Sequence, residues 1–396
     1  MANKIFYGKQ FIDQKDKNNV LKALSSDLIT RGKFVKTFEN NLKKYFVCKN
    51  AITCSSGTAA LHLAFLSISL KKNDVVIIPA INFVASLNIL NLLKAKVYFA
   101  DVDANTGQMT PNSVLECMKK NKIKKLKLIV TMFLGGYPNN AYEFYKLKKK
   151  LGCLIVEDAC HALGSSYKVN SKIIKIGSCK HSDIAIFSLH PIKTITTGEG
   201  GIITTNNIEY SNKIKLLRSH GILRSLVSSK REGMWFYDVK YPGFNYRLSD
   251  INSALGISQL KKINKFITKR NQILKLYLRE LDGYKGVVDV LKTKKKEYSS
   301  CHLVLCKINF SKLKITKKIF FSKLAKKNIF LQVNYIPLYK FEFYKKNPIK
   351  YPNSENYFNN FFSLPVYYQL KLKDIKEILK NIKIIVDQNM RYINSK

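Results

Sequence analysis

Lys193 and Asp158 are residue types that together can handle an aldehyde cofactor. Lys193 lies in Ser188-Leu-His-Pro-Ile-Lys-Thr-Ile-Thr-Thr-Gly-Glu-Gly-Gly201, where an apolar strand breaks into a turn of hydroxyl residues and glycines, and Asp158 ends another strand-like run. A desolvated lysine is a nucleophile near neutral pH and forms an imine with pyridoxal phosphate. A buried carboxylate keeps the ring nitrogen of that cofactor protonated. The pair therefore predicts pyridoxal-phosphate chemistry.

A segment nearer the N-terminus could hold the phosphate of such a cofactor. Ser55-Ser-Gly-Thr-Ala-Ala60 follows a strand-like run at residues 51–53 and opens an apolar helix. Backbone N–H groups and the side chains around Gly57 and Thr58 then converge where the helix dipole favours an anion, and Ser188 adds a further hydroxyl. Taken alone, Ser56 or Thr58 fits a helix N-cap equally well.

Two ring side chains could position the cofactor ring. Phe83 follows a predicted strand end, where its face could stack on a pyridine ring. His161 stands three residues after Asp158 and could hydrogen-bond either that aspartate or the cofactor. In isolation, Phe83 also fits a core position and His161 a satisfied structural histidine.

The pattern of the first half of the chain predicts the fold that must position these residues. Short β-rich runs alternate with helical stretches, at residues 75–78, 97–102, 128–133, 154–157, 184–188 and 201–205. This alternation predicts an α/β fold with a mostly parallel sheet covered by helices. Ligands of such sheets bind beyond the carboxyl ends of the strands, where Asp158 and Ser188 fall.

A change of pattern near residue 260 predicts two domains. Apolar residues at helical spacing predict one long helix over residues 248–281. A strand at 300–309, a helix at 316–327, a strand at 329–335 and a helix at 372–386 then predict a small α+β domain. We expect a large cofactor-binding domain at residues 1–260, which includes an N-terminal substrate arm, and a small C-terminal domain at residues 261–396.

The formal net charge of +43 is typical of proteins that bind nucleic acid. The lysines are spread along the whole chain, so we interpret the charge as a compositional drift toward Lys, Ile and Asn, and we expect no nucleic-acid partner. A nucleic-acid-binding protein that uses interleaved aromatic residues such as Tyr142, Phe144 and Tyr145 is the alternative from another class.

Cysteine usage indicates the compartment. The eight cysteines form no Cys-x-x-Cys pair and, with the six histidines, show no zinc spacing, so we expect reduced thiols, no metal and a cytoplasmic location. The uncharged run at residues 75–93 contains Pro79 and three asparagines and fits a strand, turn and helix better than a membrane span. The N-terminal residues lack the apolar core of a signal peptide.

Several stretches together resemble the DegT/DnrJ/StrS sugar aminotransferases, a fold-type I pyridoxal-phosphate family, over nearly the whole chain. They are Ser56-Gly-Thr-Ala-Ala-Leu-His-Leu-Ala64, Pro79-Ala-Ile-Asn-Phe-Val-Ala85, Glu157-Asp-Ala-Cys-His-Ala-Leu-Gly164, the Lys193 segment and Gly243-Phe-Asn-Tyr-Arg-Leu-Ser-Asp250. Within the family, the His-Pro-x-Lys form and three further segments are most similar to the pseudaminic-acid-pathway enzymes, which act on a UDP-linked 4-keto-6-deoxy N-acetylhexosamine. These segments are Phe6-Tyr-Gly-Lys-Gln10, Leu217-Arg-Ser-His-Gly-Ile222 and Gln332-Val-Asn-Tyr-Ile-Pro-Leu338.

The resemblance implies a role for each matched residue. Lys193 would bind the cofactor aldehyde, Asp158 would pair with the ring nitrogen, and Phe83 and His161 would hold the ring. The phosphate would be held by Gly57, Thr58 and Ser188, and by Asn245 from the partner subunit of a homodimer with shared active sites. The residues that match positions near the nucleotide sugar are Tyr7, Thr30, Gln332, Asn334 and Tyr335.

The resemblance also implies transamination with glutamate as the amino donor, and Arg247 is a candidate for binding the donor carboxylate. Two departures weaken the substrate assignment: Asn334 stands where a histidine is usual, and Lys9 where an arginine is common. Other keto-sugar substrates, of the perosamine or 4-amino-arabinose type, are alternatives. A cysteine desulfurase would need a nucleophilic cysteine in a mobile loop, which we do not find, and an inactive relative would usually lack Lys193.

Overall fold

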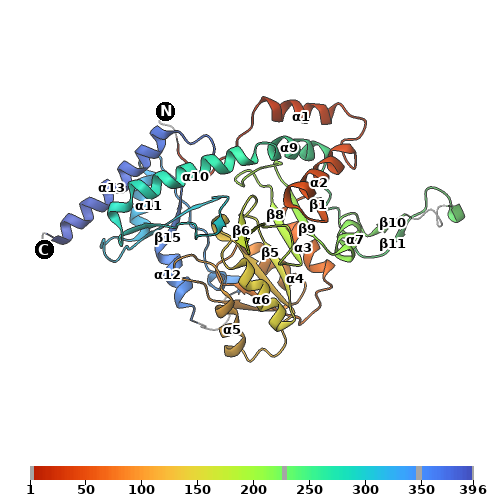
Figure 1. Ribbon diagram of the computed structural model, residues 1–396, viewed down its shortest axis with the longest axis horizontal. Helices are drawn as coiled ribbons and strands as arrows, with labels where there is room; N and C mark the ends of the chain where they lie inside the picture. Colours follow the sequence, from red (N-terminus) through yellow and green to blue (C-terminus); the bar gives the residue numbers. More distant parts are fainter. Residues whose placement is uncertain (1–3, 225–229, 345–349, 395–396) are drawn as a thin grey trace.

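The computed structural model describes residues 4–224, 230–344 and 350–394 and is built around one seven-stranded sheet (Figure 1). The strand order is β1-β9-β8-β5-β4-β2-β3. Strands β3, β2, β4, β5 and β8 are parallel to one another, and β9 runs antiparallel to both of its neighbours. The prediction of a mostly parallel sheet is confirmed. Its strands are β1 (Asn50–Cys54), β2 (Val75–Pro79), β3 (Lys96–Ala100), β4 (Leu128–Met132), β5 (Leu154–Asp158), β8 (Ile184–Ser188) and β9 (Gly201–Thr205).

Helices cover both faces of this sheet because its strands are apolar on both sides. In β8, Ile184 and Ile186 pack into the hydrophobic cluster of one face, whereas Ala185 and Phe187 pack into the cluster of the other. The first face carries α3 (Gly57–Ser67), α4 (Val84–Leu92) and α7 (Ile208–Leu217). The second carries α2 (Lys33–Phe46), α5 (Pro111–Lys120), α6 (Ala141–Leu151) and α9 (Asp250–Leu260).

The single long helix predicted over residues 248–281 is wrong. The structure has two helices, α9 and α10 (Ile263–Glu280), separated by a turn at Lys261 and Lys262. The Lys262 ammonium binds Asp13 and Asp16 at the start of α1 (Gln14–Leu24), at 2.9 and 2.5 Å. This tertiary ion pair fixes the turn, and hydrophobic periodicity carries no sign of it.

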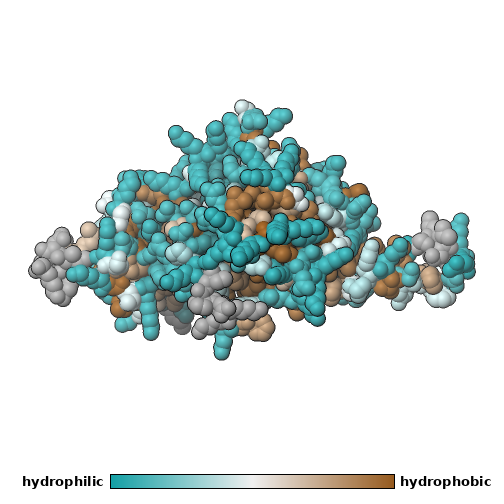
Figure 2. All heavy atoms as spheres, turned by 90° about the horizontal axis from the view of Figure 1, so that it is seen from below, coloured by the Kyte–Doolittle hydropathy of each residue, from teal (hydrophilic) through white to brown (hydrophobic). Residues whose placement is uncertain are grey.

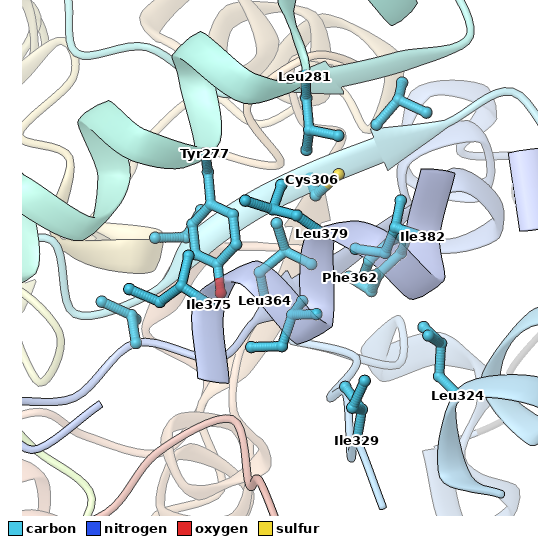
Figure 3. Close-up of a cluster of buried hydrophobic side chains, with 14 of the residues drawn as sticks. Tyr277, Leu281, Cys306, Leu324, Ile329, Phe362, Leu364, Ile375, Leu379 and Ile382 are labelled. Atoms are coloured by element: carbon cyan, nitrogen blue, oxygen red, sulfur yellow. The ribbon is translucent and has the colours of Figure 1, made fainter. Parts of the chain in front are cut away.

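A second hydrophobic core lies between α10, α11 (Lys317–Ala325), α13 (Leu372–Asn394) and an antiparallel sheet of order β12-β14-β15. Figure 3 shows its centre, where Tyr277 of α10 lies among apolar side chains of β14, β15 and α13. The strands are β12 (Val288–Val290), β14 (Val304–Ile308) and β15 (Phe361–Leu364). Strand β14 lies within the predicted strand at 300–309. The division into domains at residue 260 stays a prediction.

The strand predicted at residues 329–335 is also wrong. Only isolated bridges occur there, between Ile5 and Ile329 and between Gln332 and Ser363. The segment starts at buried Ile329 in the second core and continues to Asn334 and Tyr335 on a cavity wall, so it cannot follow one sheet edge. Through the first bridge, Ile5 joins the core made by the C-terminal part of the chain.

The remaining elements connect these two cores or project from them. The short strands β10 (Ile222–Leu223) and β11 (Asp238–Val239) form the base of an arm that leaves the body of the molecule (Figure 1). Figure 2 shows a face covered mostly by hydrophilic residues, with hydrophobic residues gathered near its middle. The other elements are β6 (Ser166–Val169), β7 (Lys172–Lys175), β13 (Glu297–Tyr298), α12 (Pro352–Asn360), and short helices at Leu134–Gly136, Asp282–Tyr284, Leu338–Lys340 and Glu342–Tyr344.

Candidate active site

One cavity of about 320 Å³ lies at the carboxyl ends of β5 and β8 and the start of α3. Both Lys193 and Asp158 line it. The other residues predicted from the sequence to belong to the site also line it, with the exception of Thr30, Asn245 and Arg247. They are Tyr7, Gly57, Thr58, Phe83, His161, Ser188, Gln332, Asn334 and Tyr335.

Asp158 is the last residue of β5, and only 3% of its surface is exposed. Its carboxylate accepts hydrogen bonds from the Ser86 hydroxyl at 3.2 Å and from the backbone N–H of Cys160 at 3.3 Å. Burial raises the pKa of Asp158, while these hydrogen bonds and the nearby Lys193 oppose the shift. A carboxylate in this setting can bind a protonated nitrogen far more strongly than one in water.

Lys193 sits in the turn after β8, where its backbone N–H donates to the His190 carbonyl at 2.9 Å. Its side chain opens onto the cavity but is enclosed by protein, and this desolvation lowers its pKa, against the opposing charges of Cys160 and Asp158. A lowered pKa increases the fraction of neutral amine, which is the nucleophilic form. The residue is therefore suited to bond an aldehyde.

The start of α3 has the features of an anion cradle. Ser56 is the N-cap, and its hydroxyl accepts the N–H of Ala59 at 3.0 Å. In the part of the chain that the structure describes, no hydrogen bond engages the N–H groups of Gly57 and Thr58. A side chain at position 57 would approach Ser188 Cβ to 3.0 Å, so glycine keeps this corner open.

His161 makes its hydrogen bonds with groups other than Asp158, which was one of the two partners considered from the sequence. Its Nδ1 accepts the backbone N–H of Gly135 at 3.3 Å, and its Nε2 lies 2.9 Å from the Tyr335 hydroxyl. Burial lowers its pKa well below 6.5. Phe83 is 53% exposed, so it is not a core residue, and its ring centroid lies 5.6 Å from that of Tyr335.

The residues predicted to contact the nucleotide sugar lie partly in the cavity and partly outside it. Tyr7, Gln332, Asn334 and Tyr335 lie on the cavity wall, and the buried Asn334 accepts the Ser363 hydroxyl through its Oδ1 at 2.9 Å. Asn245 is bridged to Ser219, outside this cavity. Thr30 precedes Arg31, which lines a separate pocket.

Sequence reasoning missed three groups of this site. Cys160 and Glu199 line the cavity, and Ser86 binds Asp158. Cys160 could have been predicted, because it lies between Asp158 and His161. A turn that carries two site residues brings the residues between them to the same cavity. Ser86 gave no such indication, since it comes from a helix 72 residues away in the sequence.

These residues fit pyridoxal phosphate. An unengaged pair of helix N–H groups suits the phosphate, buried Asp158 suits the ring nitrogen, exposed Phe83 offers a ring face, and Lys193 suits the aldehyde. The fold and the site define a fold-type I pyridoxal-phosphate enzyme. The sequence model of the DegT/DnrJ/EryC1/StrS aminotransferase family matches residues 10–383. The chain belongs to this family and is a pyridoxal-phosphate-dependent aminotransferase.

Known relatives are similar over almost their full length. The chain is 37% identical over 386 residues to a UDP-4-amino-4,6-dideoxy-N-acetyl-beta-L-altrosamine transaminase of Campylobacter jejuni, covering 97% of this chain and 98% of the relative. The structure of Helicobacter pylori PseC, an aminotransferase involved in the biosynthesis of pseudoaminic acid, matches with a TM-score of 0.87 and 29% identity, over 98% of this chain and 100% of that one. A Streptococcus pneumoniae protein in its PLP form matches with a TM-score of 0.87 and 25% identity, over 98% of this chain and 100% of that one.

Three further features of the described residues concern nucleic-acid stacking, metal binding and membrane spans. Phe144, one of the aromatic residues considered for nucleic-acid stacking, is buried in the core. No three His, Cys, Asp or Glu side chains among the described residues are grouped to hold a metal ion. Within those same residues, no helix has the length and apolar character needed to cross a membrane.

Proposed function

We propose that the protein transfers an amino group from glutamate to the keto carbon of a UDP-linked 4-keto-6-deoxy N-acetylhexosamine, of the L-altrosamine type used in pseudaminic acid biosynthesis. The observation that carries the proposal is the meeting of Lys193 and Asp158 in one cavity of a chain that is 37% identical to a transaminase named for that sugar. A Helicobacter pylori transaminase named for the same sugar is 31% identical to the chain over 386 residues.

The residues of the cavity divide the chemical work. Pyridoxal phosphate, when bound, supplies a protonated ring that accepts the electron pair freed at the reacting carbon. Asp158 would hold the ring nitrogen in its protonated state. In its neutral form, Lys193 Nζ would take the proton from the α-carbon of the amino donor and later deliver a proton to the sugar carbon. One lysine would thus both hold the cofactor and carry protons.

The polar groups from the N-terminal arm and the 332–335 segment are the proposed contacts of the sugar. Tyr7 and Tyr335 offer hydroxyls and Gln332 an amide at the cavity wall. Asn334 Oδ1 already accepts the Ser363 hydroxyl, and we propose that the amide nitrogen of Asn334 donates to the substrate. A histidine at that position would offer a ring nitrogen instead.

The proposal includes a homodimer with shared active sites. Asn245 is exposed and lies outside the cavity of its own chain, so a role at the cofactor phosphate requires a second subunit. Apolar side chains on the arm beyond β10, such as Met234 and Trp235, are 78% and 74% exposed and are suited to burial against another subunit. The eight free thiols favour a reducing compartment such as the cytoplasm.

The test is to incubate the protein, loaded with pyridoxal phosphate, with UDP-linked 4-keto sugars and glutamate. We expect 2-oxoglutarate and a 4-amino sugar, with the product configuration read by NMR. The matched control is Lys193→Ala, which should form neither product. Failure with every N-acetylated sugar, together with turnover of a different nucleotide-linked keto sugar, would contradict the proposed substrate and leave the transamination in place.

A further inference from the structure

A small pocket of about 10 Å³ lies beside the turn that carries Lys193. Its walls come from residues 9–11 of the N-terminal arm, from that turn, from Tyr368, and from α9 and α10, which run end to end along one edge of the molecule (Figure 1). The arm is fixed to α9, because the Gln259 amide donates to the Phe11 carbonyl at 2.9 Å. The pocket is therefore built from held segments and has room for one water molecule or one monatomic ion.

The charged side chains on its wall are all cations. Lys9, Lys193 and Arg270 line the pocket, and among the described residues no carboxylate does. Of the lysine and arginine side chains that the structure describes, Arg270 is the buried one, with 3% of its surface exposed. A buried charge normally has a partner of opposite sign, because its removal from water is costly. The wall of this pocket supplies none.

Arg270 also lacks an acidic partner elsewhere. It forms no ion pair within the part of the chain that the structure describes. Its Nη1 donates to the carbonyl oxygens of His302 and Val366 at 3.1 and 2.9 Å, whereas its buried Nε has no partner among the described residues. Burial lowers the pKa of Arg270 to about 10, so the guanidinium is still charged at neutral pH. A full positive charge and an unused donor thus remain uncompensated in the interior.

A neutral donor lies on the same wall. Thr194 is 5% exposed, and within the described residues its hydroxyl makes no hydrogen bond. The neighbouring Thr196 differs, because its hydroxyl donates to the Leu189 carbonyl and accepts the Gly198 N–H, both at 2.9 Å. The Thr194 hydroxyl is therefore available to donate to an anion in the pocket.

Size and charge together select the occupant. A water molecule would satisfy Nε of Arg270 but would leave its charge without a counterion. The three cations of the wall disfavour a metal ion, and a space of about 10 Å³ is too small for a phosphate or a carboxylate group. A monatomic anion meets both conditions.

We propose that this pocket binds a chloride ion, held by the Arg270 guanidinium and the Thr194 hydroxyl. The ion would join the N-terminal arm, the Lys193 turn and α10, which are far apart in the sequence, and would stabilise the folded protein. Lys193 is the one lining residue that this pocket has in common with the larger cavity, so the chloride site is separate from the site of the cofactor. It does not depend on the proposed function.

The test is thermal unfolding of the purified holoenzyme in sodium gluconate, into which chloride, bromide or iodide is titrated at constant ionic strength. Gluconate is too large for the pocket. A ligand that binds only the folded protein raises the unfolding temperature in a saturable way. We expect saturation at a lower concentration for chloride than for bromide, and the smallest effect for iodide. Nonspecific binding to a chain with a net charge of +43 gives the opposite order, because the weakly hydrated iodide adsorbs best.

Two variants locate the site. Arg270→Gln removes the buried charge, and we expect it to bind chloride at least ~10-fold more weakly than wild type. The matched control is Arg279→Gln, which removes an exposed guanidinium from the same helix and should bind chloride as wild type does. Thr194→Val keeps the shape of the side chain without its hydroxyl and should weaken chloride binding about 5-fold, the effect of losing one hydrogen bond.

Equal unfolding temperatures in chloride and gluconate would overturn the proposal and leave a water molecule as the occupant. An effect that is largest for iodide would overturn it as well. So would an undiminished chloride response in Arg270→Gln, and where that variant does not fold, the same outcome in Thr194→Val decides. Since these measurements need no turnover, a failure of the proposed transamination does not affect them.

Discussion

The hydroxyl of Tyr335 lies 2.9 Å from Nε2 of His161, and the backbone N–H of Gly135 points at Nδ1 of the same ring, at 3.3 Å. Because Nδ1 accepts that N–H, the neutral ring carries its proton on Nε2 and donates it to the Tyr335 oxygen. Burial and the nearby Lys193 lower the pKa of His161 well below 6.5, so the ring is neutral at physiological pH. The Tyr335 O–H is then free to donate into the cavity.

Replacing Tyr335 with Phe should therefore remove a hydrogen-bond donor from the cavity and lower kcat/KM about 10-fold, the effect of losing one well-placed hydrogen bond. Steady-state kinetics checks this, with the half-exposed Tyr298→Phe as a control that keeps full activity. Nitrogen NMR of the wild type should show a protonated Nε2 and a bare Nδ1 on His161 down to pH 6. Protonation of both nitrogens at that pH would contradict the assignment.

Lys193→Ala should abolish transamination and leave the fold intact, because no other lysine lines the cavity among the described residues. Borohydride treatment of the wild type should fix the cofactor to the peptide that contains Lys193, as read by mass spectrometry, and should fix none in the variant. Circular dichroism should be the same for both. Lys168→Ala, which replaces an exposed side chain of strand β6, is the control and should behave as wild type. Label on a different lysine would disprove the role.

Glu157 predicts a pH dependence of stability. Burial raises its pKa from 4.5 to about 7, and its Oε2 has no hydrogen-bond partner in the described structure. A raised pKa in the folded state means that its stabilising contribution is complete below pH 4.5 and is lost as the pH rises through 7. Glu157→Gln should thus have a higher free energy of unfolding than wild type at pH 8, by about 3 kcal/mol at most, and show no advantage at pH 4.5.

Thermal unfolding of both proteins at the two pH values measures this difference. The control is Glu116→Gln, which removes the same charge from an exposed side chain. Because no buried charge is involved, its free energy of unfolding should show no such pH-dependent increase over wild type. If Glu157→Gln were less stable than wild type at pH 8, the prediction would be contradicted, because other groups of the protein would then stabilise the charged, buried carboxylate.

The proposed sharing of active sites between two subunits predicts complementation between two inactive chains. A Lys193→Ala chain retains Asn245, and an Asn245→Ala chain retains Lys193. If Asn245 serves the cavity of the partner subunit, a mixed dimer contains one cavity with both residues and should recover about half of the wild-type activity on a per-dimer basis. Activity of co-expressed, doubly purified dimers is compared with each homodimer. Recovery no greater than that of the Asn245→Ala homodimer would place Asn245 with its own cavity.

The sequence permitted a good prediction of the parallel sheet, because each of its strands is a short apolar run bounded by turn residues. It also located Lys193, Asp158 and the start of α3, since each lies at the end of such a run. It failed at Lys262, where an ion pair with α1 breaks a periodic helix, and at residues 329–335, where a β-like composition serves a bent segment. Contacts such as Ser86 with Asp158 depend on the tertiary fold and leave no local pattern.

The backbone of Ile5 donates to Asn328 and accepts from Phe330, both at 2.8 Å, and its side chain is sealed into the core of the C-terminal region. The segment around Ile5 can therefore make these contacts only after the last third of the chain has been synthesised. A fragment made from residue 261 onward would lack one piece of its own interior.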